Sequence, residues 1–301
     1  MGLPPRDLPP PPGPLPIWET VTASYRSVFV DNLNHLPNAV AGPFVLSLMI
    51  MYLFFRLGID VTLLGGNPTT ASGWLGLILA GFVSLVPYVI FAVAWHRLIL
   101  LGPAVAAPTV IPGMTNRHWR FYGYSLLLIL LGIVVALVIV GLSTLIAVLI
   151  FRSQLLGGLV ALATVAVALA VILRLSLVLP PTAIDKHYGI GDAFRLSEKQ
   201  GFRLLVAFIV ISIPFVIVNF LIDEHVRDLA AEIDRYPAAA FSGIMSLYIW
   251  IAIYTVINYL GMAIGVSFLS LSFMHLSGWR RENGGEATPP PPTGDAGFHS
   301  S

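Results

Sequence analysis

LRLSLVLPPTAIDKHYGIGDAFRLSEKQGFRLL, residues 173–205, is the stretch of sequence that determines the fold. Its pattern predicts that an apolar helix ends at Pro180-Pro181 and that a short polar turn follows. A surface helix is expected to begin near Asp192, and a new apolar helix near Phe202. Because the rest of the chain repeats variations on this unit, we expect apolar helices joined by polar, amphipathic connectors.

The composition indicates the class of protein. The chain has 301 residues, of which 57% are hydrophobic and only 10% are charged, whereas a soluble domain has about 25% charged residues. Several stretches contain the roughly 20 apolar residues that a membrane-spanning helix needs. The sequence therefore predicts an all-α, polytopic integral membrane protein. The absence of cysteine excludes disulfides and thiolate metal sites.

The predicted organisation has three parts. Residues 1–16 form a disordered proline-rich tail, residues 17–278 a six-span transmembrane domain, and residues 279–301 a second disordered proline-rich tail. Within the domain, residues 17–36 have the helical periodicity of an amphipathic interfacial helix. The six spans are expected at 37–58, 73–101, 123–151, 155–179, 202–222 and 241–276, with a short helical loop at 223–240.

Lys and Arg set the orientation, since they stay on the cytoplasmic side of short loops. The loop at 59–72 has neither residue, and the loop at 223–240 has two arginines among five acids. The opposite connectors are basic: Arg117, Arg120, Lys186, Arg195, Lys199 and Arg203. We therefore expect a multi-pass protein of a bacterial inner (cytoplasmic) membrane with both termini in the cytoplasm.

An internal repeat is a further hypothesis. Arg97-Leu98-Ile99-Leu100 and Arg174-Leu175-Ser176-Leu177 end two even spans, 77 residues apart, and Phe268-Leu269-Ser270-Leu271 lies near the end of the sixth. Three parallel copies of a helical hairpin would explain these matches, although apolar sequence also produces them by chance.

Arg97 and Arg174 are the leading candidates for function, because ionisable residues inside spans often mark sites. A guanidinium can hold a phosphate through two N–H groups, so both arginines are candidates for binding a lipid phosphate. His96 could join such a site, and Arg117 and Arg120 lie in a connector without acids. The alternative is that Arg97 and Arg174 extend toward lipid headgroups with no specific role.

Four further residues inside spans favour helix packing. Asn219 and Asn258 are typical of interhelical hydrogen bonds, and Gly261 and Gly265 form a G-x-x-x-G pair that allows close approach of helices.

Catalytic and metal chemistry have little support. His225 lies among acids, but one histidine with flexible carboxylates is a weak pattern, and a solvated acidic loop is the preferred interpretation. No H-E-x-x-H, G-x-S-x-G or phosphate-binding glycine motif occurs. No predicted span contains Asp or Glu, which argues against ion-coupled transport. We expect no catalytic residue, no metal and no cofactor.

Three segments carry a resemblance to a known family: VAWHRLILLG (93–102), LRLSLVLPPTAID (173–185) and GDAFRLSEKQGFRLL (191–205). Together they resemble the YciC-like proteins and the membrane domain attached to some glycerophosphodiester phosphodiesterases, over roughly residues 17–278. The resemblance implies a six-span bundle with amphipathic cytoplasmic connectors in a bacterial inner membrane. It implies no catalytic residue, because the soluble phosphodiesterase domain has no counterpart here.

The sequence thus predicts a non-enzymatic membrane protein that acts as a scaffold, an accessory subunit of a membrane complex or a lipid-organising protein. Its expected partners are membrane lipids, anionic ones in particular, and other membrane proteins or a second copy of the chain, but no nucleic acid. A transporter or channel for a lipid-like or small apolar solute is the alternative. It would require a polar cavity at mid-membrane, for which the available groups are Asn219, Asn258, Ser143, Thr144 and Thr164.

Overall fold

The described part of the chain is all-helical and contains six helices that can cross a membrane. A computed structural model describes residues 13–56, 71–106, 114–146, 154–235 and 240–280, and these contain no strand. The candidate spans within them are Leu33–Phe54, Ile78–Leu101, Asn116–Ile139, Gly158–Ala183, Gly201–Leu229 and Met245–Ser277. The prediction of a six-span, all-α membrane protein is confirmed.

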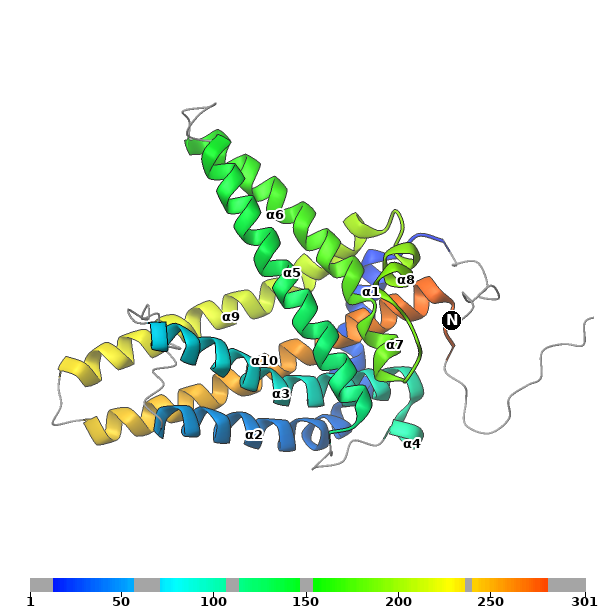
Figure 1. Cartoon of the computed structure of the whole chain (residues 1–301). Coiled ribbons are helices and arrows are strands. Elements are labelled where there is room, and N and C mark those ends of the chain that lie inside the picture. Colours follow the sequence, from blue (N-terminus) through cyan, green and yellow to red (C-terminus); the bar gives the residue numbers. More distant parts are fainter. Residues whose placement is uncertain (1–12, 57–70, 107–113, 147–153, 236–239, 281–301) are drawn as a thin grey trace, which may run out of the picture.

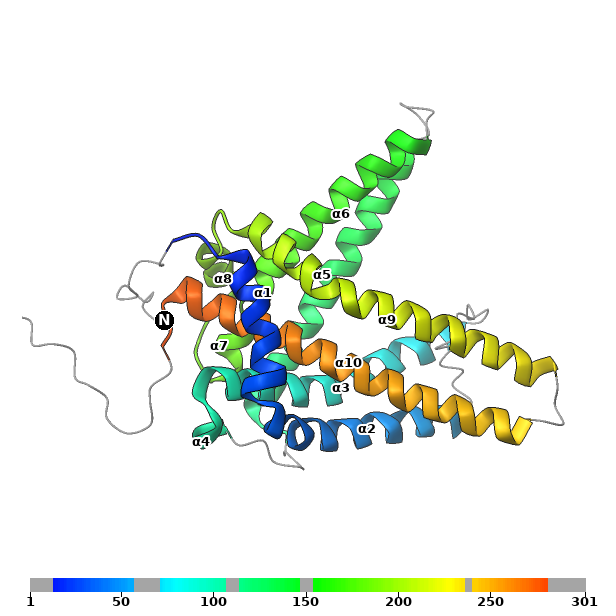
Figure 2. The ribbon, with the colours of Figure 1, turned by 180° about the vertical axis from the view of Figure 1, so that it is seen from behind.

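The long helices pair as three antiparallel hairpins (Figure 1). The hairpins are α2 (Leu36–Arg56) with α3 (Ala71–Leu101), α5 (Asn116–Ile146) with α6 (Gln154–Ser176), and α9 (Gly201–Arg235) with α10 (Ala240–Ser277). The first and third hairpins run alongside each other as a four-helix bundle. The α5–α6 hairpin contacts that bundle at one end and leans away from it toward the other (Figures 1 and 2).

The short elements gather at one end of the molecule, which we call the connector end (Figure 2). They are α1 (Ile17–Arg26), a π-helical turn (Ser27–Asp31), a 3₁₀ turn (Leu33–His35), α4 (Pro103–Ala106), α7 (Leu179–Ala183) and α8 (Ile190–Leu196). Each hairpin starts and finishes at the connector end, as parallel repeats of a hairpin require.

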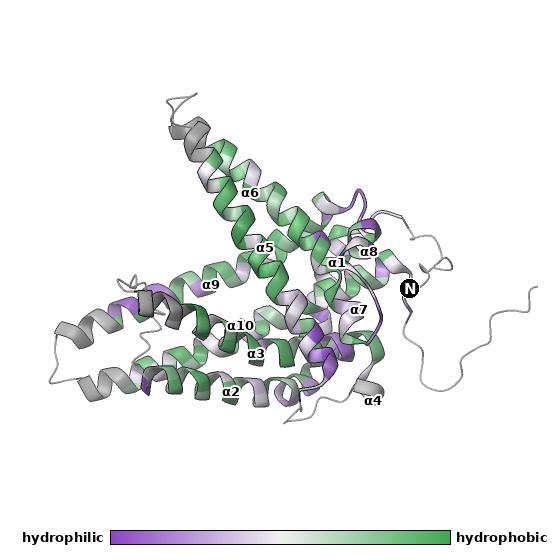
Figure 3. Ribbon diagram, in the orientation of Figure 1, coloured by the Kyte–Doolittle hydropathy of each residue, from purple (hydrophilic) through white to green (hydrophobic). Residues whose placement is uncertain are grey.

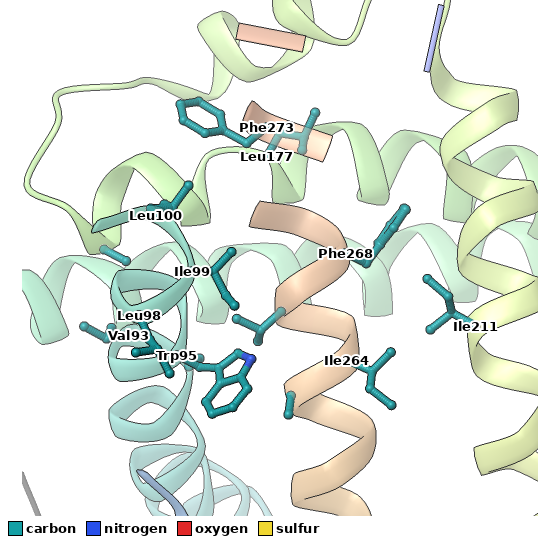
Figure 4. Packing of buried hydrophobic residues seen from close by; sticks show 14 of the residues in the cluster. Val93, Trp95, Leu98, Ile99, Leu100, Leu177, Ile211, Ile264, Phe268 and Phe273 are labelled. Carbon is teal, nitrogen blue, oxygen red and sulfur yellow. The ribbon is translucent and has the colours of Figure 1, made fainter. Parts of the chain in front are cut away.

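The core is concentrated near the connector end, where α3 packs against α10 (Figure 4). Trp95 is fully buried there and donates from its indole Nε1 to Ser267 Oγ of α10 at 2.9 Å. Ser27 of the π-helical turn donates to the same oxygen at 3.1 Å. One buried serine thus joins the interfacial segment, α3 and α10.

The outer surfaces of the long helices are apolar (Figure 3). Leu137 of α5 and Leu162 of α6 are 68% and 67% exposed, and many other large apolar side chains are also exposed. A soluble monomer rarely exposes continuous apolar surface on this scale. The hydrocarbon of a bilayer is the solvent that suits it, so the protein is an integral membrane protein.

The interfacial helix predicted at residues 17–36 is interrupted. α1 ends at Arg26, and Asn32, with φ −129°, separates the two short turns that follow. The Asn32 side chain donates to the carbonyl of Ser27 at 2.8 Å, so a side chain replaces the regular helical ladder at this point. Val21, Ser24 and Val28 form the buried face, whereas Trp18 is 69% exposed.

Two span boundaries differ by more than five residues from the prediction. α5 begins at Asn116, so the basic segment expected in a connector forms its first turns. α9 continues to Arg235 without the expected break after residue 222. The prediction that no span contains an acid is therefore wrong, since Asp223, Glu224 and Asp228 lie within the candidate span Gly201–Leu229.

The length of α9 explains why these acids are tolerated. Its 35 residues extend about 52 Å, which exceeds the roughly 30 Å of a bilayer's hydrocarbon. Asp223 follows Gly201 by 22 residues, about 33 Å along the axis, and therefore reaches the opposite interface. There it pairs with Arg227 one turn later.

The tail predicted to be disordered covers residues 1–16, but the end of this segment is ordered. Leu15 is fully buried, its backbone N–H donates to Gln200 Oε1 at 3.1 Å, and its carbonyl accepts from Arg203 at 3.0 Å. Most of both predicted proline-rich tails, and most of the loop at 59–72, lie outside the described residues.

Candidate functional site: a basic cluster and an intramembrane cavity

The first candidate site is a pair of arginines that share one carboxylate at the connector end. Arg97, near the end of α3, lies 3.9 Å from Asp185 Oδ2, and Arg117, in the first turn of α5, lies 3.1 Å from the same oxygen. The two guanidinium side chains are 23% and 26% exposed, while the Asp185 side chain is 50% exposed. Two positive charges therefore meet one negative charge beside solvent.

Local structure holds Asp185 in place. Pro180 and Pro181 lie at the start of α7, where proline is tolerated because the first N–H groups of a helix have no helical partner. Asp185 follows the end of α7 with a left-handed φ of +60°. The Lys186 N–H returns to the Pro181 carbonyl at 2.9 Å, which closes the turn and directs this carboxylate between α3 and α5.

The start of α5 is fixed by a cap. The backbone N–H of Thr115 donates to His118 Nδ1 at 3.1 Å. A side chain in the first turn thus provides a hydrogen-bond acceptor for the N–H of the residue that precedes the helix. This contact sets where α5 begins and so where Arg117 lies.

Further basic groups surround the arginine pair. Arg120 lies 3.5 Å from His187 Nδ1, and Lys186 lies 5.5 Å from the ring centroid of Trp279. Arg97, Arg117 and Arg120, which the sequence analysis singled out, thus all contact one segment, residues 183–187. The sequence analysis missed Asp185, although an acid beside Lys186 in a basic connector was an available signal.

Arg174 belongs to a different contact. Its Nε donates to Ser197 Oγ at 3.1 Å and its guanidinium donates to the Phe194 carbonyl at 2.8 Å. The guanidinium also lies over the Phe194 ring, 3.6 Å from its centroid. Arg174 therefore holds α8 against α6 and does not meet Arg97.

His96 faces the protein interior, away from the arginine pair. It is fully buried on α3, and its Nδ1 lies 2.7 Å from Ser270 Oγ of α10. Its ring also packs against Phe121 of α5, with centroids 5.6 Å apart. Its second ring nitrogen, Nε2, is buried and has no hydrogen-bond partner among the described residues.

The second candidate site is a cavity of about 640 Å³ between α3, α5, α6, α9 and α10. His96 and Phe121 line it near the connector end, and Asn219 and Asn258 line it deeper in the membrane. The Asn258 Nδ2 donates to the Tyr254 carbonyl of its own helix at 2.8 Å, while the buried Asn219 Oδ1 has no partner within the described part of the chain.

The two glycines of the G-x-x-x-G pair differ in their surroundings. A Cβ at Gly261 would lie 3.0 Å from the Phe215 ring of α9, so a larger residue there would have to displace that ring. A Cβ at Gly265 would meet nothing within 4 Å, and Gly265 lines the cavity.

The described residues hold no group of three or more histidines and acids that could bind a metal ion. His225 packs edge-on against Trp250, with ring centroids 4.6 Å apart.

Comparison with known proteins adds no relative. No protein-family model, curated protein or solved structure matches this chain. The resemblance to the YciC-like proteins therefore stays a prediction.

Proposed function

We propose that this is a non-enzymatic membrane protein that binds and organises anionic lipids at the connector end, which faces the cytoplasm of a bacterial inner membrane. The observation that carries the proposal is that two arginines, Arg97 and Arg117, contact a single carboxylate, Asp185, so that one positive charge is left in excess. A lipid phosphate can supply the negative charge that the pair lacks, and a guanidinium can bind it through two N–H groups.

The position of the pair also favours a lipid ligand. Arg97 lies four residues before the end of α3, about 6 Å along the axis, and Arg117 lies in the first turn of α5. Both guanidinium groups are therefore near the depth at which phosphates lie. Basic groups at a membrane surface contribute about 1 kcal/mol each to binding of anionic lipid.

The test is lipid retention measured by mass spectrometry after purification in mild detergent. Arg97→Gln with Arg117→Gln should lower retention of phosphatidylglycerol on the order of tenfold. Arg195→Gln is the matched control, because Arg195 is 70% exposed at the same end and pairs with Asp192 in its own helix.

Asp185→Asn separates lipid binding from a purely structural role of the cluster. If the arginines bind phosphate, removal of the competing carboxylate should raise retention of anionic lipid. Unchanged retention in both variants would contradict the proposal.

A transporter for a lipid-like or small apolar solute is the second candidate. The cavity favours it, because Asn219 and Asn258 line a space between hairpins within the candidate spans. Reconstituted protein would then move a fluorescent lipid analogue between leaflets of a vesicle, and Asn219→Leu should slow that movement.

A role as scaffold or accessory subunit makes a different prediction. Extraction from the native membrane would then yield a stoichiometric protein partner, and the partner's chemistry would define the function.

A further inference from the structure

We propose that the cavity between the α5–α6 hairpin and the bundle binds a neutral lipid with a free hydroxyl group, and that His96 Nε2 accepts the hydroxyl hydrogen. The inference is independent of the arginine pair, because neither Arg97 nor Arg117 lines the cavity.

The hydrogen bonds around His96 determine which of its nitrogens carries the proton. Ser270 Oγ lies 2.9 Å from the Val266 carbonyl, to which its single hydroxyl hydrogen is donated. The 2.7 Å contact between Ser270 Oγ and His96 Nδ1 then requires the Nδ1–H of His96 to donate. In this tautomer Nε2 is a bare acceptor.

Three other polar residues of the cavity also offer acceptors to a ligand. The hydroxyl groups of Ser176 and Ser212 donate to carbonyls of their own helices, each at 2.8 Å, and so present only lone pairs to a ligand. The Asn219 amide oxygen is buried and accepts no hydrogen bond from any residue that the structure describes. A ligand that donates a hydrogen bond satisfies these acceptors, whereas a ligand without a donor leaves them unpaired.

The lining also excludes a charged ligand. Among the described residues that line the cavity there is no Asp, Glu, Lys or Arg. A phosphate or an ammonium would remain unpaired in this apolar space, at a large desolvation cost. The remaining lining is mostly aliphatic and aromatic, which suits alkyl chains.

The cavity opens sideways toward lipid. Leu169 of α6 and Val216 of α9 both line it, and they are 36% and 63% exposed. The opening therefore lies between α6 and α9, where the α5–α6 hairpin leans away from the bundle (Figure 1). His96 lies five residues before the end of α3, about 8 Å along the axis, at a depth that a lipid hydroxyl can reach.

Photocrosslinking to the full-length protein in phosphatidylcholine vesicles tests this proposal. The probes are a diacylglycerol with a photoactivatable acyl chain and its methyl ether, which has the same chains but no hydroxyl hydrogen. We expect the alcohol to label peptides of α6 and α9 about tenfold more than the ether does, since an unpaired acceptor disfavours a ligand without the donor.

Two variants separate the hydroxyl contact from the cavity itself. His96→Phe keeps a ring of similar shape without an acceptor and should abolish the preference for the alcohol. His96→Gln retains an amide at the depth of Nε2 and should retain part of that preference. Gly265→Leu should reduce labelling by both probes, because its side chain projects into open cavity space.

The remaining outcomes overturn the proposal. Equal labelling by alcohol and ether in the unmodified protein would exclude hydroxyl recognition. Stronger labelling of α6 and α9 by a phosphatidylglycerol probe would show that the cavity takes a charged lipid. Labelling unaffected by Gly265→Leu in a protein that unfolds at the normal temperature would place the lipid elsewhere.

Discussion

At the scale of single residues, the side chain of Arg174 on α6 contacts both the end of α8 and the start of α9. Its guanidinium contacts the last turn of α8 through Ser197 and the Phe194 carbonyl, and its stem lies 3.1 Å from where a Cβ at Gly201 would be. The side chain therefore fixes α8 against α6 just before α9 begins.

Replacement of Arg174 should accordingly lower stability. Arg174→Gln should cost about 1–3 kcal/mol, because it removes a charged donor from a carbonyl at the end of α8. Arg174→Lys should lower the stability by less than Arg174→Gln does. It should still be less stable than the unmodified protein, since an ammonium cannot reproduce both hydrogen bonds and the stacking on Phe194. Thermal unfolding in detergent measures the loss.

Retention of phosphatidylglycerol provides the control for Arg174. Since Arg174 lies apart from Arg97 and Arg117, Arg174→Gln should leave lipid retention unchanged. A loss of retention equal to that of the Arg97 and Arg117 double variant would contradict this separation of roles.

Asp192 makes the start of α8 sensitive to acid. Its carboxylate accepts the Gly189 N–H at 2.9 Å and pairs with Arg195, and these contacts lower the pKa of Asp192 below its ordinary value. Ionised Asp192 therefore stabilises α8. That stabilisation is complete above the ordinary carboxyl pKa of about 4 and is lost as the pH falls through the lower pKa of the folded state.

Hydrogen exchange at the Gly189 amide measures this effect. The protection factor should fall between pH 6 and pH 2 in the unmodified protein. In Asp192→Asn, which keeps an acceptor without the charge, the protection factor should be lower at pH 6 and nearly constant with pH. An equal fall in both proteins would refute the role of the charge.

The sequence identifies charged residues inside spans but not their partners. Arg97 and Arg174 occupy matching positions at the ends of even helices, yet one contacts Asp185 and the other the end of α8. Asp185 and Ser270 meet their partners only when distant segments of the chain fold together. No spacing in the sequence predicts such single contacts. This is why the sequence analysis missed both.

At the scale of elements, α9 and α10 pack closely at one glycine. Gly261→Ala should destabilise the hairpin by about 1–3 kcal/mol, since the new Cβ would approach the Phe215 ring to 3.0 Å. Gly265→Ala is the matched control and should be nearly neutral, because nothing lies within 4 Å of the added atom. Equal unfolding temperatures for the two variants would contradict the packing argument.

Hydropathy predicts the existence of the helices better than their ends. All six spans follow from apolar length, because burial in lipid dominates their energetics. The ends depend on local contacts of single side chains, such as the Thr115–His118 cap of α5 and the Asn32–Ser27 contact after α1. α9 passes residue 222, and an i,i+4 ion pair, Asp223 with Arg227, supports the helix beyond the hydrocarbon.

At the scale of the whole molecule, the lean of the α5–α6 hairpin could not be predicted from sequence. Neither of its helices has a distinct polar face, so hydrophobic pattern does not distinguish a lipid-facing side from a protein-facing one. The cavity depends on this lean. His96, Asn219 and Asn258 could be recognised singly as polar residues in spans, but not as the lining of one space.

The orientation of the molecule in its membrane is the last prediction. Both described ends of the chain and all basic connectors lie at the connector end, which the distribution of Lys and Arg assigns to the cytoplasm. The chain has no cysteine, so single cysteines can be introduced into an unmodified background. Glu198→Cys and Asp228→Cys report on opposite ends, since both positions are exposed and α9 separates them.

In intact spheroplasts, a membrane-impermeant maleimide should label Asp228→Cys and not Glu198→Cys, and permeabilisation should make Glu198→Cys reactive. The reverse pattern would place Arg97 and Arg117 on the outer face. The outer leaflet of the inner membrane would then have to supply any anionic lipid that this pair binds. The labelling result therefore decides in which leaflet the effect of Arg97→Gln with Arg117→Gln on lipid retention must be interpreted.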